Sequence, residues 1–246
     1  MLSKTQKIPF PQELAYAAGI LTMALGVALV SASRFGYSMV VAPAYLLSRL
    51  LEQYITFGMA EYIFQGILLI GMCLALRRFR LSYLFSFVTA VLYGTVFDGM
   101  LRLTALLPSD TLPLRIAYFT LGTLSISISV ALFVHTYIAP EVYELLVREV
   151  AQAKNAPFGR VKWIYDAVSC LASILLSVTL FGPGAFAGCT PASLGQAVLD
   201  GTVIEGIGIG TVLAALVNGP LITLFGRWME AHFDFTANPR LYNILH

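Results

Sequence analysis

Two carboxylates stand inside long apolar stretches of the sequence, where ionisable side chains are rare. Glu61 and Asp166 each lie in such a stretch, and Glu205 directly precedes a third. A charge within a bilayer is costly, so residues of this kind are functional candidates by default. We expect the three to act as coupling or gating carboxylates that take up protons or pair with a cationic substrate. The alternative is that Glu61 and Asp166 are solvated at the membrane interface, with Asp166 paired to Lys162 four residues earlier.

Three polar side chains are candidates for contacting a solute. Gln65 lies one helical turn from Glu61, on the same face and deeper in the same stretch. Asn218 is the most central polar residue of the last stretch, and Tyr93 occupies the matching position in the first half of the chain. Asn218 and Tyr93 are therefore expected to line one cavity from opposite halves. The alternative is that such groups only form hydrogen bonds between helices.

Gly206, Gly208 and Gly210 open the last apolar stretch. Exposed N–H groups at a helix N-terminus attract anions, and transporters use interrupted helices in this way. We therefore add the three glycines to the candidate substrate site. The alternative is that small residues permit close helix packing here. The Gly-x-Gly-x-Gly spacing is not a nucleotide-binding motif, because no strand precedes it.

The remaining reactive residue types suggest no enzymatic or metal chemistry. The three cysteines, Cys73, Cys170 and Cys189, are too scattered for a disulfide framework or a zinc site. The three histidines show no spacing typical of metal ligands. We can locate neither a nucleophile with a partner nor an acid–base pair. We therefore expect no catalytic residue, no metal, no cofactor and no enzymatic activity.

The composition indicates where these residues must work. Of the 246 residues, 58% are hydrophobic and 11% are charged, whereas soluble domains carry about 25% charged residues. The mean hydropathy is +0.81. A soluble protein of this size exposes too much surface to hide so many apolar side chains. Composition therefore excludes a soluble enzyme, and the small net charge of +2 excludes a nucleic-acid-binding protein.

Six apolar stretches are long enough, or nearly so, to cross a bilayer as helices. They cover residues 14–33, 55–76, 81–101, 116–138, 163–181 and 206–225. The first is too long for the apolar part of a signal peptide, so we interpret it as a retained span. Two shorter stretches, 39–51 and 141–154, are predicted to be amphipathic helices at the membrane interface. The predicted fold class is an all-α polytopic membrane protein with six transmembrane helices.

Basic residues set the expected orientation. With both termini in the cytoplasm, every Lys and Arg lies inside except Arg34, Arg49, Arg102 and Arg115. This distribution follows the positive-inside rule, and the three arginines of segment 77–80 are its firmest anchor. We therefore expect a multi-pass protein of the bacterial inner membrane.

The two halves of the sequence resemble each other. In each half an apolar stretch is followed by Ala-Pro, at positions 42–43 and 139–140, and then by an amphipathic stretch. A span with an intramembrane carboxylate and a span containing glycine complete each half. Three spans per half place the second half upside down relative to the first, which is the plan of many secondary transporters. We predict two inverted three-helix repeats, residues 1–110 and 111–246.

The first and last spans carry a resemblance to a known family. Residues 205–222, Glu-Gly-Ile-Gly-Ile-Gly-Thr-Val-Leu-Ala-Ala-Leu-Val-Asn-Gly-Pro-Leu-Ile, resemble the final span of the bacterial YczE/YitT-like integral membrane proteins. Leu25-Gly-Val-Ala-Leu-Val and Phe35-Gly-Tyr-Ser are similar to the opening span of that family. Thr223 stands where the family often has an Asp. The resemblance implies a transporter or an accessory membrane protein, and it implies no substrate.

The inverted repeat favours a secondary transporter of a small organic solute, and the intramembrane carboxylates favour proton coupling. Two alternatives stay open: a non-transporting accessory or assembly protein, and the substrate-capture subunit of a larger transport or biosynthetic complex. The expected partners are the lipid bilayer, a small-molecule solute, and either a second copy or a partner membrane protein, with no nucleic acid. Flux through the protein alone would separate a transporter from both alternatives.

Overall fold

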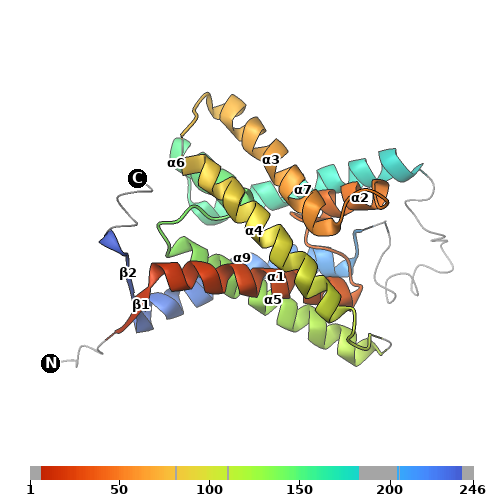
Figure 1. The fold of residues 1–246 in the computed structure, drawn as a ribbon, viewed down its shortest axis with the longest axis horizontal. Coiled ribbons are helices and arrows are strands. Elements are labelled where there is room, and N and C mark those ends of the chain that lie inside the picture. The colour runs from red at the N-terminus through yellow and green to blue at the C-terminus, as the bar shows by residue number, and fades with distance from the viewer. Residues whose placement is uncertain (1–6, 81, 110, 183–203, 205, 240–246) are drawn as a thin grey trace.

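The computed structural model describes residues 7–80, 82–109, 111–182, 204 and 206–239. These residues are mostly helical (Figure 1). The helices are α1 (Gln12–Ser33), α2 (Ala42–Leu50), α3 (Phe57–Leu76), α4 (Ser82–Thr104), α5 (Leu112–Val134), α6 (Val142–Ala153), α7 (Phe158–Phe181) and α9 (Ile209–His232). Two short strands, β1 (Ile8–Pro11) and β2 (Phe233–Thr236), pair in parallel and join the start of α1 to the end of α9.

Six of these helices, α1, α3, α4, α5, α7 and α9, are long and apolar enough to cross a membrane. The prediction of an all-α membrane protein with six such helices is therefore confirmed. Many large apolar side chains on these helices are exposed, as a lipid-facing surface requires. The bounds differ most in the last span, which begins at Ile209 and continues to His232.

Helices α1 and α5 form the centre of the bundle and run antiparallel. A Cβ on Gly26 would lie 2.9 Å from the carbonyl oxygen of Gly122, and a Cβ on Gly122 would lie 2.7 Å from that of Gly26. One end of the contact is held by Arg115, whose Nε donates to the carbonyl oxygen of Ser33 at 2.8 Å. Glycine at both positions is what lets the two backbones approach this closely.

The remaining helices are arranged in a related way around α1 and α5. Helix α4 packs on α1, and α9 packs on α5. The short helix α2 packs on α3 and α7, and the short helix α6 packs on the same two long helices. In Figure 1, α2 and α6 lie near opposite ends of α3.

The segments leading into the two short helices are each held by a threonine of a long helix. Thr211 Oγ1 in α9 donates to the carbonyl oxygen of Tyr37 at 2.6 Å, before α2. Thr89 Oγ1 in α4 donates to the carbonyl oxygen of Ala139 at 3.0 Å, before α6. A buried backbone carbonyl outside regular structure needs such a donor, so these threonines stabilise the entry of both segments into the bundle.

Both short helices, predicted to be amphipathic helices at the membrane interface, are packed among the long helices of the bundle. The buried residues of α2 include Ala42, Ala44 and Leu46, and those of α6 include Val142, Leu145 and Val147. Glu144 and Glu149 of α6 are also buried, because they find polar partners on α7 and α4. An amphipathic pattern predicts one buried face, but it does not predict that the polar face will be covered by other helices.

Candidate functional site

A buried cluster of charged side chains forms where α6 enters the bundle. Gln65 of α3 holds the start of α6: its Oε1 accepts from the backbone N–H of Val142 at 3.0 Å, and its Nε2 donates to Glu141 Oε2 at 3.4 Å. One turn earlier on α3, Glu61 Oε2 accepts from the Tyr143 hydroxyl at 2.8 Å. Glu61 and Gln65 are completely buried. Two carboxyl groups, Glu61 and Glu141, therefore lie on either side of one amide side chain.

The other part of the cluster is centred on Lys162 of α7. Its Nζ lies 3.2 Å from Asp166 Oδ1 and 3.7 Å from Glu144 Oε1. All three residues are more than nine-tenths buried. The pairing of Asp166 with Lys162 considered from the sequence is present, but it is buried within the bundle and not solvated at an interface.

Negative groups outnumber positive groups in this cluster. Glu61, Glu141, Glu144 and Asp166 are all buried, whereas the described part of the cluster has one buried ammonium, that of Lys162, which pairs with Glu144 and Asp166. Among the described residues, no hydrogen-bond partner reaches Glu61 Oε1, Glu141 Oε1 or Glu144 Oε2, although each atom is buried. Four buried carboxylates cannot all be ionised beside one cation, because a buried charge needs compensation. The cluster must therefore hold protons or attract a cation.

The two carboxyl groups beside α6 show the expected perturbation. Burial raises the pKa of Glu141 well above its ordinary value, and the nearby carboxylates of Glu144 and Glu61 raise it further. Burial also raises the pKa of Glu144, which the neighbouring Lys162 ammonium partly offsets. Perturbed pKa values of this kind cluster at functional sites.

A small cavity, which we name the central chamber, adjoins the cluster. Its volume is about 40 Å³, which holds a few water molecules and is too small for an organic solute. Its polar lining includes Ser38, Tyr93, Glu141, Tyr143, Glu144, Lys162, Asp166 and Asn218, and its apolar lining comes from α1, α5, segment 39–41 before α2, and Ile222 of α9. Both halves of the chain therefore contribute to one buried polar space.

A larger cavity, which we name the vestibule, begins where the central chamber ends. Its volume is about 480 Å³, and it lies among the end of α5, the segment before α6, α6 itself and α9. Glu144 and Ile222 line both cavities. The vestibule is within the size range of small-molecule sites, which is roughly 300–1,000 Å³.

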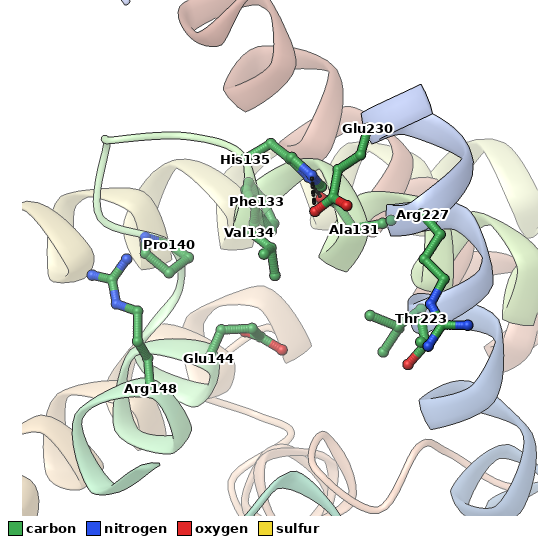
Figure 2. A pocket seen from close by; sticks show the side chains of 12 residues that line it. Ala131, Phe133, Val134, His135, Pro140, Glu144, Arg148, Thr223, Arg227 and Glu230 are labelled. Carbon is green, nitrogen blue, oxygen red and sulfur yellow. Dashed lines mark hydrogen bonds and ion pairs between the residues drawn. The ribbon is translucent and has the colours of Figure 1, made fainter. Parts of the chain in front are cut away.

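Figure 2 shows the charged groups of the vestibule. Arg148 of α6 and Arg227 of α9 border it from opposite sides, and Glu144 lies between them. His135 Nε2 lies 3.3 Å from Glu230 Oε1, the pair marked by the dashed line. Ala131, Phe133, Val134, Pro140 and Ile222 supply apolar surface. The cavity thus offers both signs of charge beside an apolar wall.

The structure brings several of the predicted site residues together. Tyr93 and Asn218 both line the central chamber, and Asn218 Oδ1 also accepts from the Ser127 hydroxyl at 3.4 Å. Glu61 and Asp166 contact the same short segment at the start of α6 from opposite sides, through Tyr143 and through Lys162. Glu205 lies outside the described residues.

The three glycines lie elsewhere. Gly206 lies just before α9, Gly208 is its N-cap residue and Gly210 is its second residue. None of the three glycines lines the central chamber or the vestibule. Gly206 has φ +78°, and a Cβ there would lie 2.8 Å from the Tyr45 ring. The Gly210 N–H donates to the carbonyl oxygen of Phe35 at 2.7 Å. These glycines allow close backbone packing, the alternative considered from the sequence.

Glu141, Tyr143, Glu144 and Arg148 were not among the predicted site residues. They belong to the stretch interpreted as an interfacial helix, where charges are ordinarily solvated. One signal could have found them: an Ala-Pro pair stands at the start of α2 and another stands just before α6. Two segments with the same entry sequence are expected to have the same depth in a repeat, so both would be placed inside the bundle.

Comparison with known proteins gives a family and no activity. The chain matches the Family of unknown function (DUF6198) over residues 10–227. No curated protein and no solved structure matches it. The matched range includes every residue of the buried cluster and reaches Arg227 in the vestibule.

Proposed function

This chain belongs to DUF6198, a family of unknown function, and we propose that it is a secondary transporter of a small organic solute coupled to protons. It would work in the bacterial inner membrane with both termini in the cytoplasm, as its basic residues favour. The resemblance to YczE/YitT-like proteins is part of the same proposal. The buried cluster has no catalytic role in it.

One observation carries the proposal: four buried carboxyl groups lie in one cluster at the point where the two halves of the chain meet, and the buried ammonium of Lys162 pairs with two of them, Glu144 and Asp166. Intramembrane carboxyl groups of this kind mark proton or ion pathways. A purely structural cluster would be expected to balance its charges, because unpaired buried charges destabilise the fold. The surplus carboxyl groups supply sites where protons bind and leave.

The arrangement of the helices supports two inverted halves. Helices α1 and α5 are antiparallel, and α4 and α9 flank them in corresponding ways. Counted from the start of each helix, Glu61 and Lys162 are both fifth residues, and Gln65 and Asp166 are both ninth residues. In the first half, Gln65 binds the start of α6, which belongs to the second half. In the second half, Lys162 and Asp166 line the central chamber together with Ser38, which precedes α2 of the first half. Transporters with such halves place their site at this junction.

The two cavities support a pathway that is closed on one side. The vestibule opens beside the ends of α5 and α9, which the predicted orientation places in the cytoplasm. The central chamber beyond it is too small for an organic solute. Alternating access would require the chamber to widen as the two halves rock against each other.

The experiment that tests the proposal is flux through the purified protein in liposomes. A pH-sensitive dye inside the vesicles reports proton movement when single metabolites from a broad panel are added outside. We expect at least one metabolite to drive protein-dependent proton movement. Glu61→Gln should abolish that movement, whereas Glu52→Gln, a change to an exposed carboxylate on the loop after α2, should leave it intact.

Other outcomes would favour the alternatives. Tight binding of a metabolite without flux indicates a substrate-capture subunit. Folded protein that neither binds nor moves any metabolite, but copurifies with a membrane partner, indicates an accessory protein. Either result would overturn the transporter proposal.

A further inference from the structure

We infer that the vestibule binds a small aliphatic zwitterion of the amino-acid type, with its ammonium group on Glu144 and its carboxylate on Arg227. The inference rests on the proposed function, since it names the solute class of the same pathway. It also assigns Glu144 a second role: this side chain holds either a proton or the ammonium group of the solute.

The cationic end of the solute is indicated by Glu144. Its Oε1 is 3.7 Å from Lys162 Nζ, whereas its Oε2 is buried and has no hydrogen-bond partner among the described residues. A buried carboxylate oxygen normally accepts a hydrogen bond, so this unpartnered oxygen of a residue that lines the vestibule points to a missing donor. An ammonium group supplies donors and positive charge together. In Figure 2 the Glu144 side chain lies between Arg148 and Arg227.

The anionic end is indicated by Arg227. No hydrogen bond or ion pair of its guanidinium is found with the described residues, and Glu230, one turn along α9, is paired with His135 instead. A guanidinium binds a carboxylate through two parallel hydrogen bonds. Arg148 also lines the vestibule, but Glu149 interacts with it electrostatically. Arg227 is therefore the better anchor for a carboxylate.

The apolar part of the solute is indicated by the apolar residues that line the same cavity. Phe133, Val134 and Ile222 line the vestibule, and Ala131 and Pro140 complete this surface. Small-molecule sites combine such apolar surface with a few polar groups that fix orientation. A branched aliphatic amino acid has all three features at once.

Competition between a proton and an ammonium group at Glu144 would link binding to pH. Several titratable or charged groups face Glu144 and set the balance: Glu61 from α3, Tyr93 from α4, His135 from α5, Glu141 and Arg148 from α6 and its entry, Lys162, Tyr165 and Asp166 from α7, and Arg227 and Glu230 from α9. The acidic members favour the protonated form of Glu144, and Lys162 favours the ionised form. Solute binding would then release one proton.

The test uses purified protein and three matched probes. L-leucine carries both charges, 4-methylpentanoate lacks the ammonium group, and 3-methylbutylamine lacks the carboxylate. We expect thermal stabilisation by L-leucine and at least about tenfold weaker binding of each single-charge probe, because each loses a charge-assisted hydrogen bond. The affinity for L-leucine should rise with pH from 5.5 to 7.5, by up to about tenfold per unit.

Variants test the two anchors. Arg227→Gln and Glu144→Gln should each weaken L-leucine binding at least about tenfold. Arg148→Gln should weaken it less, and Arg160→Gln, a change to an exposed arginine that does not line the vestibule, should leave it unchanged. Glu144→Gln should also remove the pH dependence. If Glu144→Gln does not fold, proton release by the unaltered protein on L-leucine binding decides, with one proton per molecule expected.

Several results would overturn the inference. Equal binding of L-leucine and 4-methylpentanoate, or binding without proton release, contradicts the role of Glu144. A zwitterionic lipid headgroup has the same pair of charges, so the assay is repeated in nanodiscs with and without phosphatidylethanolamine. Stabilisation by that lipid alone, with no response to L-leucine, assigns the site to lipid. Binding of L-leucine without flux refutes transport and leaves the site standing, whereas proton-coupled flux of other metabolites without L-leucine binding refutes the site alone.

Discussion

Replacing Lys162 by methionine tests whether charge compensation holds the buried cluster together. Methionine keeps most of the apolar stem and removes the ammonium group, which lies 3.2 Å from Asp166 Oδ1 and 3.7 Å from Glu144 Oε1. In this variant the described part of the cluster would keep four buried carboxyl groups and would have no buried cation.

The size of the effect follows from these two distances. At an effective dielectric constant of about 20, Coulomb's law gives an attraction of about 5 kcal/mol at the shorter distance and about 4.5 kcal/mol at the longer one. Desolvation offsets part of this attraction, and breaking one buried pair typically destabilises a protein by about 3–5 kcal/mol. For a chain of this length, that corresponds to a fall in melting temperature of roughly 6–20 °C.

The effect should depend on pH. Burial raises the pKa of Glu144, and loss of the neighbouring ammonium group raises it further. The folded variant then binds more protons than the unfolded chain above the ordinary pKa of a glutamate, so its stability falls as pH rises. Thermal unfolding in detergent should show the full loss at pH 8 and at most half of it at pH 5. Lys154→Met, a change to an exposed lysine just after α6, should have little effect at either pH.

Two results would refute this reasoning. An equal loss of melting temperature at pH 5 and pH 8 would show that Lys162 stabilises the protein through packing and not through its charge. No loss at pH 8 would show that the surrounding carboxyl groups are already protonated and that the ion pairs contribute nothing.

Three further predictions concern packing, capping and pH. Gly26→Leu should lower the stability by about 1–3 kcal/mol, since it overpacks the α1–α5 contact, whereas Gly71→Ala, where no atom lies within 4 Å, should leave the melting temperature unchanged or higher. Asp98→Asn should cost about 1–2 kcal/mol, because the carboxylate accepts from the first turn of α3 at 2.8 Å; an unchanged melting temperature would contradict this. Folding raises the pKa of Glu141 and Glu144, so the stabilisation that these protonated groups contribute is complete below about pH 4.5 and is lost as pH rises. Replacing both residues by glutamine should therefore make the melting temperature less dependent on pH between pH 5 and pH 8.

The sequence predicted the number and nature of the long helices. Apolar stretches of about 20 residues have one stable conformation in lipid, because only a helix pairs its backbone groups internally. The ends were less well predicted: α9 extends to His232, beyond Arg227, since a basic side chain near the interface does not end a helix.

The candidate site was only partly predictable. Glu61 and Asp166 were found because a charge within an apolar stretch is conspicuous, and Gln65 was found through its helical spacing from Glu61. Glu141 and Glu144 were missed because their own segment is polar, so nothing in it indicates burial. Their partners, Gln65 and Lys162, lie in other helices.

The sequence by itself thus determined the membrane environment and the six apolar helices, because both follow from local composition. Only the tertiary structure decided that α6 enters the bundle, that Glu144 lines two cavities and that the Lys162 ammonium pairs with two of four buried carboxyl groups. The physical reason is that burial of a polar segment depends on what covers it. That cover comes from α3, α4 and α7, which lie up to tens of residues away along the chain and carry no local signal of the contact.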